Sequence, residues 1–186
     1  MMQEFTQEIK GLISDTFRDM HTALPGRVIS FQPDRCEADV MPCGKYKKPD
    51  GKMVDYPKLS GVPVFVMQSL GQAATIAFPV RQGDECLLLF AEQALDTWKT
   101  GAASNADLRF DLTNAVALIG LFSRPNPLVA EACSSNAIII ELKAASKKDD
   151  KRIEISKQGI FVKGNINVKG NVSATGFTLV ENERED

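Results

Sequence analysis

Apolar and polar residues alternate most regularly near the C-terminus, in a six-residue unit that occurs three times at 160–165, 166–171 and 172–177. Each unit places two apolar or small residues two positions apart and a glycine two positions later. Side chains two apart lie on the same side of an extended chain, and Gly-Asn pairs favour turns. Each unit therefore predicts a short strand followed by a corner. A fixed short period of this kind is typical of a β-solenoid or β-helix.

These strands present one apolar face, which a single thin ribbon cannot bury. Identical partner chains could supply the other walls of the core, and three copies give a closed, symmetric arrangement. We therefore expect an intertwined triple-stranded β-helix formed by a homotrimer. Two alternatives remain. One is a β-meander packed on its own domain, and the other is a left-handed hexapeptide helix, which is less favoured because that fold carries one large aliphatic residue per unit.

The repeats and the strand before them supply the candidate site residues. The expected trimer core comprises Ile153, Ile155, Ile160, Val162, Ile166, Val168, Val172 and Ala174. The expected turn glycines are Gly159, Gly164, Gly170 and Gly176.

The N-terminal pattern has a different period. Apolar residues recur at helical spacing between Phe5 and Met20, with acidic residues and Arg18 among the intervening positions. This predicts an amphipathic helix of about five turns, which Pro25-Gly26 is expected to end. The helix could pack on its own assembly or hold a partner. His21, near its end, is expected on the surface.

From residue 27 onward the pattern predicts short strands separated by proline and glycine turns. Examples are an alternating segment at 36–41, a hairpin around Pro49-Asp50-Gly51, and the apolar run 85–90. Strands at this spacing suggest a five-stranded barrel of the OB type. The segment 124–127, with two prolines, predicts a linker.

The predicted fold is thus mainly β, in four parts. They are an N-terminal helix (1–24), an OB-fold barrel (25–127), a trimeric β-helix (128–180) and an acidic tail (181–186). The charged run 147–152 is interpreted as a solvated loop between strands.

Net charge and the cysteine and histidine content argue against several classes of function. The formal net charge is −2, which argues against a general nucleic-acid binder. The four cysteines have no C-x-x-C spacing and only one histidine accompanies them, so we expect buried free thiols and no metal site or cofactor. The single histidine also excludes most familiar nucleophile–base pairs, and the adjacent Asp84 and Glu85 are interpreted as surface turn residues. We therefore expect no enzymatic activity.

Three stretches together resemble the central spike proteins of contractile phage tails, the baseplate assembly protein V family. They are 61–65 with 71–78, then 78–90 with 96–98, and 109–118 with 120–125. The resemblance covers roughly residues 25–180. It implies an OB-fold followed by a three-chain β-helix, located in the baseplate of the virion below the tail tube after synthesis in the host cytoplasm. It also implies attachment to the tail hub protein and transient piercing of the host outer membrane when the sheath contracts.

The C-terminal residues depart from that family, in which many members end in an iron-binding His-x-His pair. Here the last residues are acidic, so we expect them to splay and leave Phe177 and Leu179 as an apolar rim for a separate tip-capping protein. Two other functions are alternatives to the spike. A nucleic-acid-binding OB module could use Tyr46 and Tyr56 near several lysines, but we expect no nucleic acid as a partner; a cell-wall hydrolase accessory protein is the other.

Overall fold

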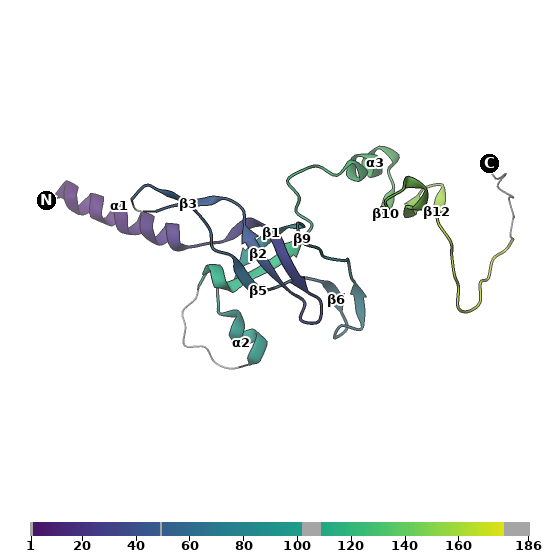
Figure 1. Cartoon of the computed structure of the whole chain (residues 1–186), viewed down its shortest axis with the longest axis horizontal. Helices are drawn as coiled ribbons and strands as arrows, with labels where there is room; N and C mark the ends of the chain where they lie inside the picture. The colour runs from purple at the N-terminus through teal and green to yellow at the C-terminus, as the bar shows by residue number, and fades with distance from the viewer. Residues whose placement is uncertain (1, 49, 102–108, 177–186) are drawn as a thin grey trace. The chain divides into compact units, whose positions relative to one another are not determined.

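The computed structural model describes residues 2–48, 50–101 and 109–176, and it divides the chain into two compact units. The first unit ends at Arg124 and the second begins at Pro125. The division lies within the proline-containing segment 124–127. Each unit is described by itself below (Figure 1).

The first unit is built on a five-stranded antiparallel sheet in the order β5-β2-β1-β8-β9. Its strands are β1 (Ala23–Gln32), β2 (Glu37–Pro42), β5 (Leu59–Pro63), β8 (Glu85–Phe90) and β9 (Ala115–Ile119). The register shifts between Val28 and Ser30 of β1 and between Ala38 and Val40 of β2. Such irregularities increase local twist and help a sheet to curl.

The curl brings the two edge strands together. Val64, just after β5, forms a parallel bridge with Ala117 of β9, and the Phe65 N–H donates to the Ala117 carbonyl over 2.9 Å. The sheet is therefore a partly closed, OB-like barrel, which agrees with the mainly β fold expected from the sequence.

Strand alternation places the core inside this curl. Val28, Val40, Cys86 and Leu88 are the largest fully buried side chains, and Leu59, Val62, Phe90, Ala115 and Ala117 surround them. Burial raises the pKa of the Cys86 thiol to about 11, so this cysteine stays protonated at neutral pH. All four cysteines are free. Cys133 is exposed, which contradicts the expectation that all of them are buried.

Smaller elements complete the first unit. They are α1 (Met2–Asp19), the paired strands β3 (Lys45–Lys47) and β4 (Met53–Asp55), the paired strands β6 (Met67–Ser69) and β7 (Ala74–Ile76), α2 (Leu95–Thr100) and the 3-10 turn η1 (Leu112–Asn114). The β3–β4 pair confirms the predicted hairpin around residues 49–51. The helix α1 already ends at Asp19, so Pro25-Gly26 does not end it as expected. Both residues lie inside β1.

The second unit contains α3 (Pro127–Ser135) and a three-stranded antiparallel sheet. The sheet consists of β10 (Ile138–Leu142), β11 (Lys151–Ser156) and β12 (Gly159–Lys163), with the 3-10 turn η2 (Lys147–Asp149) before β11. Only the first hexad forms a strand, since residues 164–176 adopt no regular helix or strand in the single chain. No helix among the described residues is long and apolar enough to cross a membrane.

Candidate functional site

The sheet of the second unit has two chemically different faces. The register pairs Ile138 with Ile155 and Ile155 with Ile160, and it pairs Ile140 with Ile153 and Ile153 with Val162. Since directly opposed residues share a face, these side chains form two continuous apolar rows. We call this surface the apolar face; it comprises Ile138, Ile140, Leu142, Ile153, Ile155, Ile160 and Val162.

Nothing in the described chain covers the apolar face. Ile138 is 65% exposed and Ile160 is 70% exposed, and the other isoleucines of the rows are exposed as well. Contiguous exposed apolar surface of this kind marks an interaction site. Four of the predicted core residues, Ile153, Ile155, Ile160 and Val162, are thus brought together on one face.

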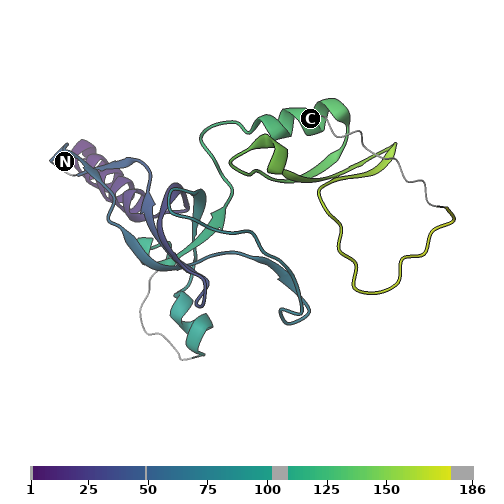
Figure 2. The same cartoon turned by 45° about the vertical axis from the view of Figure 1, so that its right-hand side comes forward.

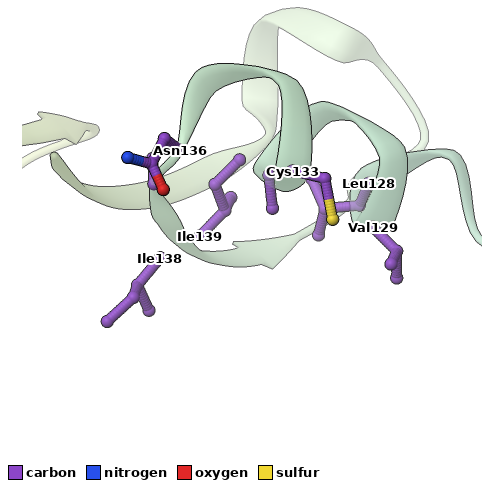
Figure 3. A pocket seen from close by; sticks show the side chains of 8 residues that line it. Leu128, Val129, Cys133, Asn136, Ile138 and Ile139 are labelled. Atoms are coloured by element: carbon purple, nitrogen blue, oxygen red, sulfur yellow. The ribbon is translucent and has the colours of Figure 1, made fainter.

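The helix α3 lies over part of the opposite face (Figure 2), on which Phe161 of β12 stays 61% exposed. Figure 3 shows Ile139 turned toward the helix and Ile138 turned away from it. The helix begins at Pro127 because the Asn126 side chain caps it by accepting a hydrogen bond from the Leu128 N–H, over 3.0 Å. Asn136, in the left-handed region at φ 51°, ends it.

A pocket of about 450 Å³ lies between α3 and β10 (Figure 3). It is lined by Leu128, Val129, Ala132, Cys133, Asn136, Ala137, Ile138 and Ile139. Substrate pockets combine apolar walls with several converging polar groups. This lining supplies only one amide and one thiol as polar side chains. The pocket is therefore a gap in the packing of α3 on β10 and does not resemble a substrate pocket.

Arg152 fixes α3 to the sheet. Its Nη2 lies 2.6 Å from Glu131 of α3 and 2.7 Å from Glu154, and its Nη1 lies 3.5 Å from Glu141. The Arg152 side chain is only 15% exposed, so the charged run 147–152 is not wholly solvated as expected. The strand pairing that brings Glu141 and Glu154 beside Arg152 is not visible in the local charge pattern.

This ion-pair cluster predicts an acid-sensitive contact between α3 and the sheet. The Arg152 guanidinium lowers the pKa of Glu131, and the neighbouring carboxylates raise that of Arg152. A carboxyl whose folded pKa is lowered stabilises the fold above its unfolded pKa, near 4.5, and loses this contribution as the pH falls through the folded value. We expect hydrogen-exchange protection of the α3 amides, corrected for intrinsic rates, to fall below about pH 4.5.

Glu131→Gln is the matched control for this prediction. It keeps the size of the side chain but removes its titration, so protection at neutral pH should be lower than in the wild type and less dependent on pH. An unchanged pH profile in Glu131→Gln would show that other carboxyls, such as Glu141 or Glu154, carry the effect.

The remaining predicted site residues lie after β12. Ile166, Val168, Val172 and Ala174 are exposed in the segment 164–176. Gly159, Gly164 and Gly170 have positive φ values of 131°, 135° and 143°, which suits corners, whereas Gly176 does not. Phe177 and Leu179 lie outside the described residues. The predicted core residues did not include Ile138, Ile140 and Leu142 of the apolar face, although the alternation of these residues with Glu141 and Lys143 was a usable signal.

Residues considered for catalysis or binding in the first unit have structural partners. Glu85 pairs with Arg27 over 3.1 Å, while the Asp84 carboxylate accepts the Arg81 N–H, so the two acids act separately. The Ser123 N–H, followed by Arg27, lowers the pKa of Glu85. Among the residues that the structure describes, no group of three or more His, Cys, Asp or Glu side chains could hold a metal ion.

The aromatic residues near the β3–β4 hairpin pack on one another. The ring centroids of Tyr46 and Tyr56 are 5.3 Å apart, and the His21 ring lies 5.7 Å from both Tyr56 and Phe90. The His21 side chain is half-buried, so it is not the surface residue expected, and the backbone N–H of His21 donates to the Phe110 carbonyl. Both tyrosines are half-buried, which leaves less of each ring available as a stacking platform for a base.

A family comparison adds to this geometry. Residues 24–120 match the family described as the phage protein Gp138 N-terminal domain, and the match covers just over half of the chain. The chain belongs to this family. The Gp138 N-terminal domain match begins within β1 and ends just after β9, so it coincides with the OB-like barrel.

Membership identifies a phage protein and supports a structural role for it. No curated protein matches the chain. The apolar face and the hexads lie beyond the matched residues.

Proposed function

We propose that this protein is the trimeric baseplate spike of a contractile phage tail or tailocin. In this proposal the OB-like barrel attaches to the tail hub, and the C-terminal part pierces the host outer membrane when the sheath contracts. The role is mechanical and uses no catalytic group or cofactor. The virion baseplate is its proposed location.

The observation that carries this proposal is the uncovered apolar face of the second unit. A sheet with a helix on one side and isoleucines exposed on the other needs a second layer to complete its core. A lipid or an unrelated partner could supply that layer for the sheet alone. A partner that repeats the same face around an axis also accounts for the hexads, whose apolar residues continue the pattern from Ile160 to Val172.

Three copies suit the geometry of a narrow shaft. Their apolar faces can meet around one axis while α3 and the Arg152 cluster remain outside. The segments 164–176, which have no strand partner in one chain, could then pair between copies and satisfy their backbone groups. Interchain pairing leaves few free edges, which gives the stiffness that force transmission requires.

A nucleic-acid-binding OB module is the principal alternative. It would need aromatic platforms along a basic groove. Lys45 and Lys47 flank Tyr46, but Lys45 pairs with Asp55 over 3.5 Å and the Tyr46 ring packs against Tyr56. No specific observation favours a cell-wall hydrolase accessory role.

The mass of the full chain in solution tests the proposal most directly. Light scattering at micromolar concentration should give three times the chain mass of 20.3 kDa. A monomer under these conditions would contradict the trimer and, with it, the spike.

A further inference from the structure

The hairpin of β6 and β7 is an uncharged projecting arm. Residues 65–78, which we call the arm, contain no Asp, Glu, Lys or Arg, although a quarter of the whole chain is charged. The arm leaves the barrel beside the Ala117 carbonyl, and Figures 1 and 2 show it standing away from the barrel strands. A two-stranded hairpin is marginally stable by itself, so an arm of this composition needs something to pack against.

One side of the arm is apolar. Met67 is paired with Ile76, so these two side chains share a face. Phe65 lies two residues before Met67 and Phe78 two residues after Ile76, just outside the paired strands. All four are exposed, Phe78 by 71%, and Leu70 at the tip is 81% exposed. The other side of the hairpin presents Gln68 and Thr75.

The same chain carries a second uncharged apolar surface, on the outside of the barrel. The register aligns Ala23 with Leu89 and Leu89 with Val116, and the next row aligns Pro25, Leu87 and Leu118. These residues alternate with the buried Cys86, Leu88 and Phe90, so they lie on the outer side of β1, β8 and β9. We call these six residues the outer patch; Leu89 within it is 40% exposed.

The outer patch explains a feature of β8 that the barrel alone does not. A strand with one face in a core and the other in water normally alternates apolar and polar residues. Between Cys86 and Phe90, β8 is apolar on both faces. Arg27 follows the outer patch along β1 and Glu85 precedes it along β8, and the ion pair between them marks its polar border.

We infer that the arm of one copy packs its apolar side on the outer patch of a neighbouring copy. Both surfaces lack charge, so neither leaves an ion unpaired when water is removed. Within one chain the arm side chains, Ala23, Pro25 and Leu89 remain exposed, while Leu87, Val116 and Leu118 of the outer patch are half-buried. The contact joins two different surfaces, and such head-to-tail contacts close into a ring when the rotation matches the number of copies.

This inference rests on the proposed trimer, which would hold three barrels near one another and raise the effective concentration of each arm at its neighbour. It adds a contact in the first unit that the apolar face of the second unit does not require. The occupant of the outer patch is therefore a second copy of this chain.

Cysteine cross-linking in the full chain tests the contact. The exposed Cys133 is first replaced in Cys133→Ser, and Met67→Cys and Leu89→Cys are then combined in this background. A short bismaleimide tolerates an offset of one residue in register. Denaturing gels should show covalent dimers and trimers. The matched control combines Leu89→Cys with Gln68→Cys, on the other side of the arm, and should give at least tenfold less product.

The outcomes separate this inference from the proposed function. A trimeric mass with the expected ladder supports the arm contact. A trimeric mass with no ladder, or with equal yields from Met67→Cys and Gln68→Cys, overturns the arm contact and leaves the spike proposal standing. A monomeric mass overturns both.

Two further results would assign the arm to another occupant. Covalent dimers from Met67→Cys alone would show that arms meet one another. Flotation with phosphatidylcholine vesicles that is lost in Phe78→Ser, without any ladder, would show that the arm binds a lipid surface. Either result overturns the contact between the arm and the outer patch.

Discussion

Ile153→Asp is expected to convert the protein from a trimer to a monomer. Ile153 lies at the centre of the apolar face, between Ile140 and Val162. In the proposed trimer the substitution brings three carboxylates together at one axis without a cation. The effective cost of burying an unpaired ion is several kcal/mol, and mutual repulsion adds to it. Light scattering should therefore give a mass near 20.3 kDa.

Two variants control for general damage to the fold. Ile153→Val keeps an apolar β-branched side chain and should remain trimeric. Lys157→Asp introduces the same carboxylate at an exposed position in the turn between β11 and β12, and it should also remain trimeric. A trimer of unchanged thermal stability in Ile153→Asp would show that the apolar face is not the interface.

Val168→Asp extends the experiment to the hexads. Val168 is exposed in the segment 164–176, which has no strand in the single chain. If this segment is interior in the trimer, the variant should fail to trimerise as Ile153→Asp does. A stable Val168→Asp trimer would restrict the interface to the sheet and contradict the expectation that the hexads line the axis.

Local alternation was sufficient to predict many strands but not their arrangement. The strand at 85–90 was predicted with the bounds of β8, because it combines strongly apolar composition with clear turn signals. Alternation states which side chains of one strand share a face. It does not state which strands pair, so Ile138 and Ile140 were not joined to Ile153 and Ile155 before the register was known.

The helix α3 was missed for a different reason. The segment 124–127 was interpreted only as a linker because proline interrupts most regular structure. Pro127 in fact occupies the first turn of the helix, and Asn126 caps it. An Asn-Pro pair before a run of helix-compatible residues was the available signal. The position of Arg152 among three carboxylates depended on α3 and the strand pairing together, so no local pattern could predict it.

Gly26→Ala is expected to destabilise the barrel, although its backbone conformation accepts alanine. Gly26 lies in the middle strand of the sheet and does not have a positive φ. An added Cβ would lie 2.7 Å from Val40 Cγ1, 3.0 Å from Leu88 Cδ1 and 3.2 Å from Cys86 Sγ. Replacing glycine with alanine usually stabilises by about 0.4–1 kcal/mol through the unfolded chain, whereas overpacking a core costs about 1–3 kcal/mol. The steric cost in the folded barrel should therefore exceed the gain through the unfolded chain.

The expected result is a drop of roughly 4–15 °C in the Tm of the first unit. Thermal unfolding is monitored by the fluorescence of Trp98. Gly11→Ala is the matched control, because an added Cβ there meets no atom within 4 Å and the helical position favours alanine. In Gly26→Ala combined with Val40→Ala, the clashing methyl is removed, so the double variant should be more stable than the sum of the two single effects by about 0.5–3 kcal/mol. Strict additivity would show that Val40 does not limit the space at Gly26, and an unchanged Tm in Gly26→Ala would contradict the close packing of β1 between Val40 and Leu88.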